Sequence, residues 1–126
     1  MKIYLLVDKA KSGKTTTLKE LGYTFCPDNG GIFSPLINLI YEGKKKIAID
    51  DYTGKGNVLE ILKMMKKGDK LIYNKKYENP KIIEAEIYKD VEIVLSTDPV
   101  LLRLLNKWLL DIGEKVNVEE FKKNTN

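Results

Sequence analysis

The feature that most constrains this fold is an apolar run that leads directly into a polar loop and then into a helix. Residues 2–7 are strand formers, residues 8–13 form the loop, and residues 15–21 carry a helical pattern that stops at Gly22. A helix that follows a buried strand through a short loop is typical of a parallel sheet, because the helix carries the chain back across the sheet. The start of the sequence therefore predicts an α/β fold.

The rest of the chain repeats this alternation of short apolar strands and amphipathic helices. We expect strands at 23–25, 47–49 and 91–95, helices at 32–41, 58–65 and 99–110, and a strand or a helix at 116–123. Two strand-like segments, 71–73 and 82–88, enclose a polar tip and predict an inserted β-hairpin over about residues 71–88. The whole pattern predicts one domain over residues 1–126, a three-layer α/β sandwich with a mainly parallel central sheet.

Composition narrows the chemistry open to such a domain. The chain of 126 residues has no histidine, which excludes an imidazole base or a histidine-ligated metal. Arg103 is the only arginine, so an enzyme that clamps phosphates with several arginines is excluded as well. Cys26 is the only cysteine, and the apolar start is too short to span a bilayer. We therefore expect a cytoplasmic protein without a membrane partner, whose net charge of +4 permits an acidic ligand.

The first loop carries the residues of a phosphate-binding loop. In the pattern G-x-x-x-x-G-K-[ST], residues 13–15 hold the last three places, and Asp8 stands where the first glycine belongs. We expect Lys14 to reach the β- and γ-phosphates of ATP, and the Thr15 hydroxyl to ligate Mg²⁺. The predicted nucleotide-binding residues are Ser12, Gly13, Lys14, Thr15 and Thr16. A plainer interpretation, an ordinary lysine-rich turn between a strand and a helix, stays open.

Two acidic residues at the end of a later strand support the nucleotide hypothesis. Asp50 and Asp51 directly follow the apolar run 47–49. An acid at this place in a phosphate-loop fold holds Mg²⁺ through water, and we assign this role to Asp50 together with Thr15. We expect Asp51 to polarise the attacking water, although many strands simply end in polar residues. The two signals, in this order along the chain, predict nucleotide binding.

These segments resemble the ATPase core of superfamily 3 helicases, the replication-initiator helicases of small DNA viruses and plasmids. The resemblance covers roughly residues 2–103 and is carried by segments 2–6, 13–15 and 47–52 and by segment 91–99, which is similar to the family's third motif. It implies a Mg²⁺-dependent ATPase that acts as a ring-shaped homo-oligomer on single-stranded DNA or RNA. A viral or plasmid source is implied as well.

The resemblance also implies roles outside the phosphate loop. Asp98 stands where the family has an asparagine that senses the γ-phosphate, and Arg103 is the candidate arginine that reaches the γ-phosphate of a neighbouring subunit. Lys75 and Lys76, at the hairpin tip, are the implied nucleic-acid contacts. Asp8 and Asp98 are acidic departures from the family pattern, and we expect both carboxylates to face the nucleotide and to weaken hydrolysis.

Several other interpretations stay open. A degenerate phosphate-loop module would bind nucleotide or nucleic acid without efficient hydrolysis. Residues 51–54 match the D-x-x-G of GTPases and Asn74 begins a guanine-reading N-K-x-D, but Tyr77 replaces its carboxylate. A nucleotide kinase needs an arginine-rich lid, which a single arginine does not make. The two hairpin lysines equally fit an ordinary exposed tip, and Arg103 equally fits a solvated helix surface.

Overall fold

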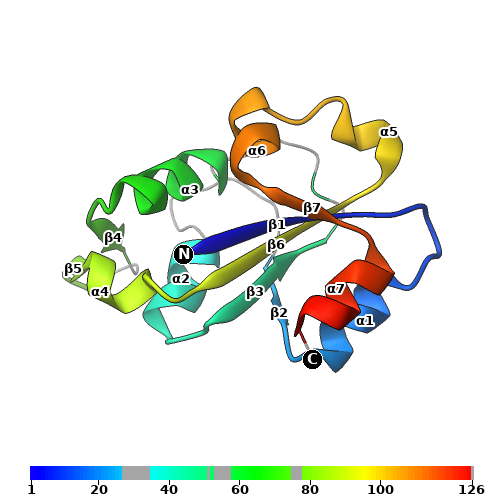
Figure 1. Cartoon of the computed structure of the whole chain (residues 1–126). Helices are drawn as coiled ribbons and strands as arrows, with labels where there is room; N and C mark the ends of the chain where they lie inside the picture. Colours follow the sequence, from blue (N-terminus) through cyan, green and yellow to red (C-terminus); the bar gives the residue numbers. More distant parts are fainter. Residues whose placement is uncertain (27–34, 51, 53–57, 75–77, 126) are drawn as a thin grey trace.

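The computed structural model describes residues 1–26, 35–50, 52, 58–74 and 78–125. Its strands in the main sheet are β1 (Lys2–Val7), β2 (Thr24–Phe25), β3 (Lys46–Ile49), β6 (Glu92–Thr97) and β7 (Glu114–Val116). They lie in the order β2-β3-β6-β1-β7, and every neighbouring pair is parallel (Figure 1). The α/β fold with a parallel sheet, predicted from the alternation of strands and helices, is confirmed.

Helices cover both faces of this sheet. They are α1 (Lys14–Glu20), α2 (Pro35–Tyr41), α3 (Val58–Lys67), α4 (Ala85–Tyr88), α5 (Pro99–Leu102), α6 (Lys107–Ile112) and α7 (Val118–Thr125). Successive strand residues point to opposite faces, so Ile3 and Leu5 join one apolar core while Tyr4 and Leu6 join a second. The first core includes residues of α2, α3 and α6, and the second includes residues of α1 and α7, which lie side by side (Figure 1). Within the described residues, no helix is both long and apolar enough to cross a membrane.

The parallel direction of the strands brings their carboxyl ends to one edge of the sheet. β6 lies between β1 and β3, with Val7 opposite Thr97 and Ile49 opposite Leu95. The loop after β1 and the acidic residue after β3 therefore lie on either side of the end of β6. In open parallel sheets this edge is where ligands bind.

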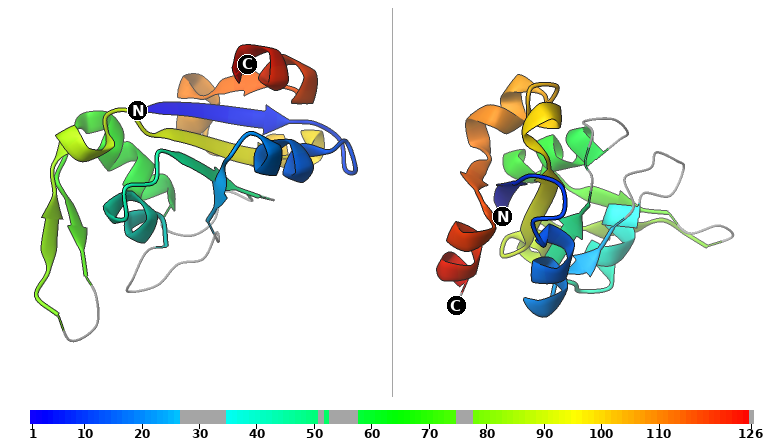
Figure 2. Two further views of the ribbon diagram at one scale, coloured as in Figure 1. Left: turned by 90° about the horizontal axis from the view of Figure 1, so that it is seen from below. Right: turned by 90° about the vertical axis from the view of Figure 1, so that its right-hand side faces the viewer.

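A separate two-stranded hairpin lies at the other end of the molecule. β4 (Leu71–Tyr73) and β5 (Lys81–Ile83) pair in an antiparallel sense, and they lie far from the loop that follows β1 (Figures 1 and 2). The inserted hairpin is confirmed for these strands. The expected strand at 85–88 is wrong, because these residues form the short helix α4. The helical turn carries Tyr88 into the core, where its hydroxyl donates to the carbonyl oxygen of Asp69 at 2.6 Å.

The expected continuous helix at 99–110 is also wrong. Residues 99–102 and 107–112 form α5 and α6, with a turn between them. Asn106 causes the new start, because its side-chain oxygen accepts a hydrogen bond from the Trp108 N–H at 2.8 Å, as an N-cap does. For residues 116–123 we expected either a strand or a helix, and the structure has both. The strand β7 ends at Val116, and the helix α7 begins at Val118.

Candidate functional site

The turn between β1 and α1 depends on backbone conformations that most residues avoid. Gly13 has a φ of 91° and Lys11 a φ of 64°, both in the left-handed region. The Ser12 N–H donates to the carbonyl oxygen of Lys9 at 3.2 Å and closes the turn. Glycine at position 13 therefore lets the chain enter α1 directly from the loop.

The ammonium group of Lys14 lies inside this loop. Its Nζ donates to the carbonyl oxygens of Asp8 at 2.6 Å and Lys9 at 3.0 Å. An ammonium group has three N–H donors, so one donor remains for a further acceptor. Lys14 thus stabilises the loop from within and keeps one donor available for an anion.

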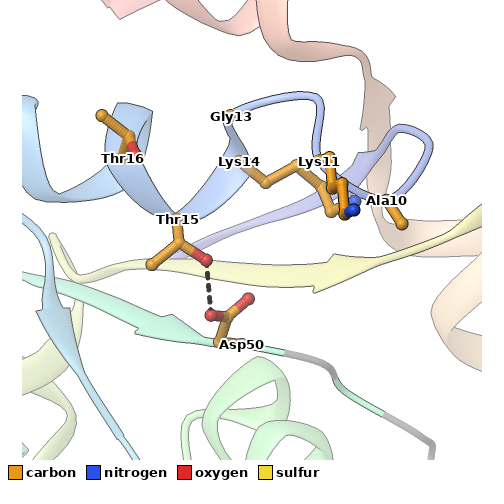
Figure 3. Close-up of a pocket in the computed structure, with 7 residues that line it drawn as sticks. All are labelled: Ala10, Lys11, Gly13, Lys14, Thr15, Thr16 and Asp50. Carbon is orange, nitrogen blue, oxygen red and sulfur yellow. Dashed lines mark hydrogen bonds between the residues drawn. The ribbon is translucent and has the colours of Figure 1, made fainter.

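The two predicted magnesium ligands meet in the structure. Oγ1 of Thr15, in the first turn of α1, donates to Oδ2 of Asp50 at 2.6 Å (Figure 3). This distance is typical of a strong O–H···O⁻ hydrogen bond. The two residues are 35 positions apart in the sequence, so the contact joins the phosphate loop to the acidic end of β3.

A pocket of about 410 Å³ opens beside these groups. The residues that line it are Ala10, Lys11, Gly13, Lys14, Thr15, Thr16 and Asp50 (Figure 3). Its volume lies in the range of small-molecule sites. Two lysines against one carboxylate give the lining a positive balance, which suits an anionic ligand. Four of the five predicted nucleotide-binding residues line the pocket, and Ser12 does not.

No protein-family model matches this chain, and no curated protein matches it. The resemblance to superfamily 3 helicases therefore stays an expectation from the sequence motifs.

The Asp8 carboxylate, which we expected to face the nucleotide, binds two backbone N–H groups of the chain. Its Oδ1 accepts from the Lys9 N–H at 2.9 Å, and its Oδ2 accepts from the Val118 N–H at 3.2 Å. Asp8 is not among the residues that line the pocket. The hydrogen bonds from Val118 and Lys9 hold the pKa of the Asp8 carboxyl below its ordinary value. The carboxylate thus joins the phosphate loop to the start of α7.

Asp98 and Arg103 lie beyond the pocket lining. Asp98 is the N-cap of α5, and its Oδ1 accepts from the Leu101 N–H at 2.7 Å. Its carboxylate therefore stabilises a helix start, and its role as a γ-phosphate sensor stays a prediction. Arg103 is exposed at the end of α5. A role for Arg103 in the site of a neighbouring subunit also stays a prediction, because it requires a second copy of the chain.

Three predicted site residues, Asp51, Lys75 and Lys76, lie outside the described residues. The role of Asp51 at the attacking water and the roles of both lysines at nucleic acid stay predictions. The hairpin that carries the lysines is present on both sides of that gap, in β4 and β5.

Ser96 is a buried polar residue of β6 that does not line the pocket. Its side chain is fully buried, and its Oγ has no hydrogen-bond partner in the described part of the chain. It pairs with Leu6 across the sheet, and it follows Leu95, the partner of Ile49. Ala10 and Lys11 are the residues of the pocket lining that the sequence did not indicate, and no motif position identifies either of them.

Proposed function

We propose that this chain is a Mg²⁺-dependent ATPase with a three-layer phosphate-loop fold, resembling a minimal superfamily 3 helicase core. One observation carries the proposal, the hydrogen bond of 2.6 Å between Thr15 and Asp50. An ordinary strand-to-helix turn has no need of an acidic partner from a distant strand. A phosphate loop has such a need, because its hydroxyl and that acid hold the same metal ion.

The residues present fit a magnesium ion bound with a triphosphate. Thr15 and Asp50 offer a hydroxyl and a carboxylate, which are the hard oxygen donors that Mg²⁺ prefers. No cluster of three His, Cys, Asp or Glu side chains occurs among the described residues, so phosphate and water oxygens would complete the coordination shell. When bound, the ion neutralises charge on the β- and γ-phosphate oxygens. Lys14 would add its free N–H donor to the same phosphates.

The partner in this proposal is single-stranded DNA or RNA, and the active form is a homo-oligomer. The hairpin formed by β4 and β5 supports the first part, since it projects from the body of the molecule at the end opposite the loop after β1 (Figure 2). The exposed Arg103 supports the second part, since no arginine lines the described pocket. A cation from a neighbouring subunit would supply the charge that this site lacks at the transferring phosphoryl group.

A second candidate function is a module that binds nucleotide without efficient hydrolysis. The observation in its favour is the position of Asp98, whose carboxylate caps α5 and does not line the pocket. If no other group replaces the sensor, the site would hold ATP and turn it over slowly. The two candidates share their binding residues and differ in turnover.

Titration of ATP and measurement of phosphate release test the proposal. Lys14→Ala removes a charge-assisted donor and is expected to weaken ATP binding about 10- to 150-fold, with the fold retained. Lys9→Ala is the matched control, because Lys9 is an exposed lysine of the same loop whose side chain does not line the pocket. Equal ATP affinity in Lys14→Ala and Lys9→Ala would contradict the phosphate-loop assignment. Retained binding with no phosphate release by the unaltered chain would favour the second candidate.

A further inference from the structure

Two tyrosines from distant parts of the chain form a stacked pair on the surface near the hairpin. Tyr41 ends α2, and Tyr73 ends β4. Their ring centroids are 4.1 Å apart, and the ring planes differ by 4°. Tyr41 is 46% exposed, whereas Tyr73 is half-buried and packs against the apolar core, so Tyr41 is the ring of the pair that is open to solvent.

A lysine lies on the same face of the hairpin as Tyr73. Lys81 is directly opposite Tyr73 in the antiparallel register, and directly opposite residues place their side chains on one face. Leu71 and Ile83, the next opposed pair on this face, are buried, which shows that this face packs against the body of the protein. The Lys81 side chain is exposed and forms no ion pair within the described residues.

The opposite face of the hairpin differs in chemistry. It carries Ile72 and Ile82, which are opposed in the register and are 56% and 63% exposed. This face has no aromatic ring and no charge at the opposed pair. The two faces of one hairpin therefore offer a comparison between an aromatic and cationic surface and an aliphatic one.

We propose that Tyr41, Tyr73 and Lys81 form a binding site for single-stranded nucleic acid, in which a base stacks on the tyrosine pair and Lys81 contacts the backbone phosphate. This inference rests on the proposed function only in taking single-stranded nucleic acid as the partner, and it does not depend on ATP binding. Two rings already held parallel offer a flat aromatic surface on which a base adds with little further ordering of the protein. Lys81, which forms no ion pair within the described residues, supplies the cation that a phosphate requires.

This site would deepen the role of the hairpin in two ways. It places the base contact at the loop end of the paired strands, where Tyr41 of α2 stacks on Tyr73 of β4, in addition to the tip at which Lys75 and Lys76 are predicted to act. It also adds a residue from α2, which lies outside the hairpin in the sequence. A strand bound here would contact the end of the sheet opposite the ATP pocket (Figure 1).

Fluorescence anisotropy with two labelled oligomers tests the site, and no nucleotide is added. One oligomer is an ordinary single strand of thymidines, and the other is an abasic strand with the same backbone and no bases. Tyr41→Ala should weaken binding of the thymidine strand about 5- to 150-fold and leave the abasic strand unaffected, because stacking needs a base. Lys81→Gln should weaken both strands and reduce the slope of log affinity against log salt by about 0.7.

Three variants serve as controls. Tyr41→Phe keeps the aromatic ring and should retain binding of the thymidine strand. Ile82→Ala truncates an exposed side chain on the opposite face of the hairpin, and it should change the affinity for neither the thymidine strand nor the abasic strand. Lys14→Ala should bind the strands normally, so failure of the ATP site and failure of this site are distinguishable. Equal losses of both strands in Tyr41→Ala, or no loss of either, would overturn the proposal. The absence of single-strand binding by the unaltered chain would overturn it as well.

Discussion

Asp8 occupies the place of a glycine in the phosphate-loop pattern, and its carboxylate is satisfied by the N–H groups of Lys9 and Val118. The sequence alone indicates a negative charge next to bound phosphates. The structure turns that charge toward the start of α7, where the partial positive charge of the helix end favours an anion. Asp8 is not among the described residues with a positive φ, so the backbone at this position does not require glycine.

The lowered pKa of Asp8 predicts a pH dependence of stability. A carboxyl group whose pKa is lower in the folded than in the unfolded state adds stability above its unfolded pKa, and this stability is lost as the pH falls through the folded pKa. The free energy of unfolding should therefore fall more steeply below about pH 4 in the unaltered chain than in Asp8→Asn. Urea unfolding at a series of pH values measures this difference. Parallel curves for the two proteins would contradict the assigned hydrogen bonds.

Thr15 is the residue at which magnesium dependence can be separated from phosphate binding. Thr15→Val keeps the shape of the side chain and removes the hydroxyl that bonds to Asp50. ATP should bind this variant with about the same affinity in the presence and absence of Mg²⁺, while the unaltered chain should bind more tightly with the ion. Isothermal titration with and without Mg²⁺ provides the comparison, and Thr15→Ser should behave as the unaltered chain does. A magnesium effect that persists in Thr15→Val would exclude the hydroxyl as a ligand.

At the scale of elements, the sequence predicts what depends on local pattern. The apolar runs of β1, β3 and β6 and the helical spacing of α3 are strong periodic signals, and the structure confirms each of these elements. Residues 85–88 and 99–110 were predicted wrongly because their apolar content fits more than one structure. The structure of these segments depends on single side chains, namely Asn106, which caps α6, and Tyr88, whose hydroxyl is buried. No sequence pattern identifies the hydrogen-bond partners of these two side chains.

The junction of α6 and β7 leaves no room for a side chain at Gly113. Its φ of −75° is accessible to any residue, so the constraint is contact rather than backbone conformation. An added Cβ would lie 2.7 Å from Cγ of Leu5 and 2.8 Å from the carbonyl oxygen of Leu109. Gly113→Ala should therefore lower the free energy of unfolding by about 1–3 kcal/mol, measured by urea denaturation. The loss should shrink when it is combined with Leu5→Ala, which removes Cγ of Leu5, and a fully additive pair would contradict the contact.

At the scale of the whole molecule, the sequence predicts the pocket beside the loop after β1 but not the site formed by the tyrosine pair. The sequence motifs that contain Lys14, Thr15 and Asp50 suggest phosphate and metal binding by their pattern alone. The parallel sheet brings these three residues to one edge. Tyr41 belongs to no motif, and it meets Tyr73 only because α2 packs against β4. A site made by packing between distant elements has no local signal, so a single sequence does not disclose it.

If the active form is the proposed oligomer, a mixture of two inactive variants should regain phosphate release. Arg103→Ala keeps its own ATP pocket and loses the exposed arginine, while Lys14→Ala loses the pocket and keeps the arginine. If Arg103 completes the site of a neighbour, each variant alone should be nearly inactive and a mixture should regain phosphate release. Lys107→Ala, another exposed cation after α5, should retain activity by itself. A mixture that stays inactive would contradict the role of Arg103 between subunits.

The order of the sheet has a consequence for how the chain is made. β1 pairs only with β6 and β7 in the described sheet, so it can pair with a neighbouring strand only after residue 91 of this sequence has been synthesised. Until then, its apolar residues have no strand beside them, and a nascent chain with such long-range pairing folds late. The central sheet thus closes only after β6 and β7 are available, and the loop that follows β1 takes its final shape late in folding rather than at its start.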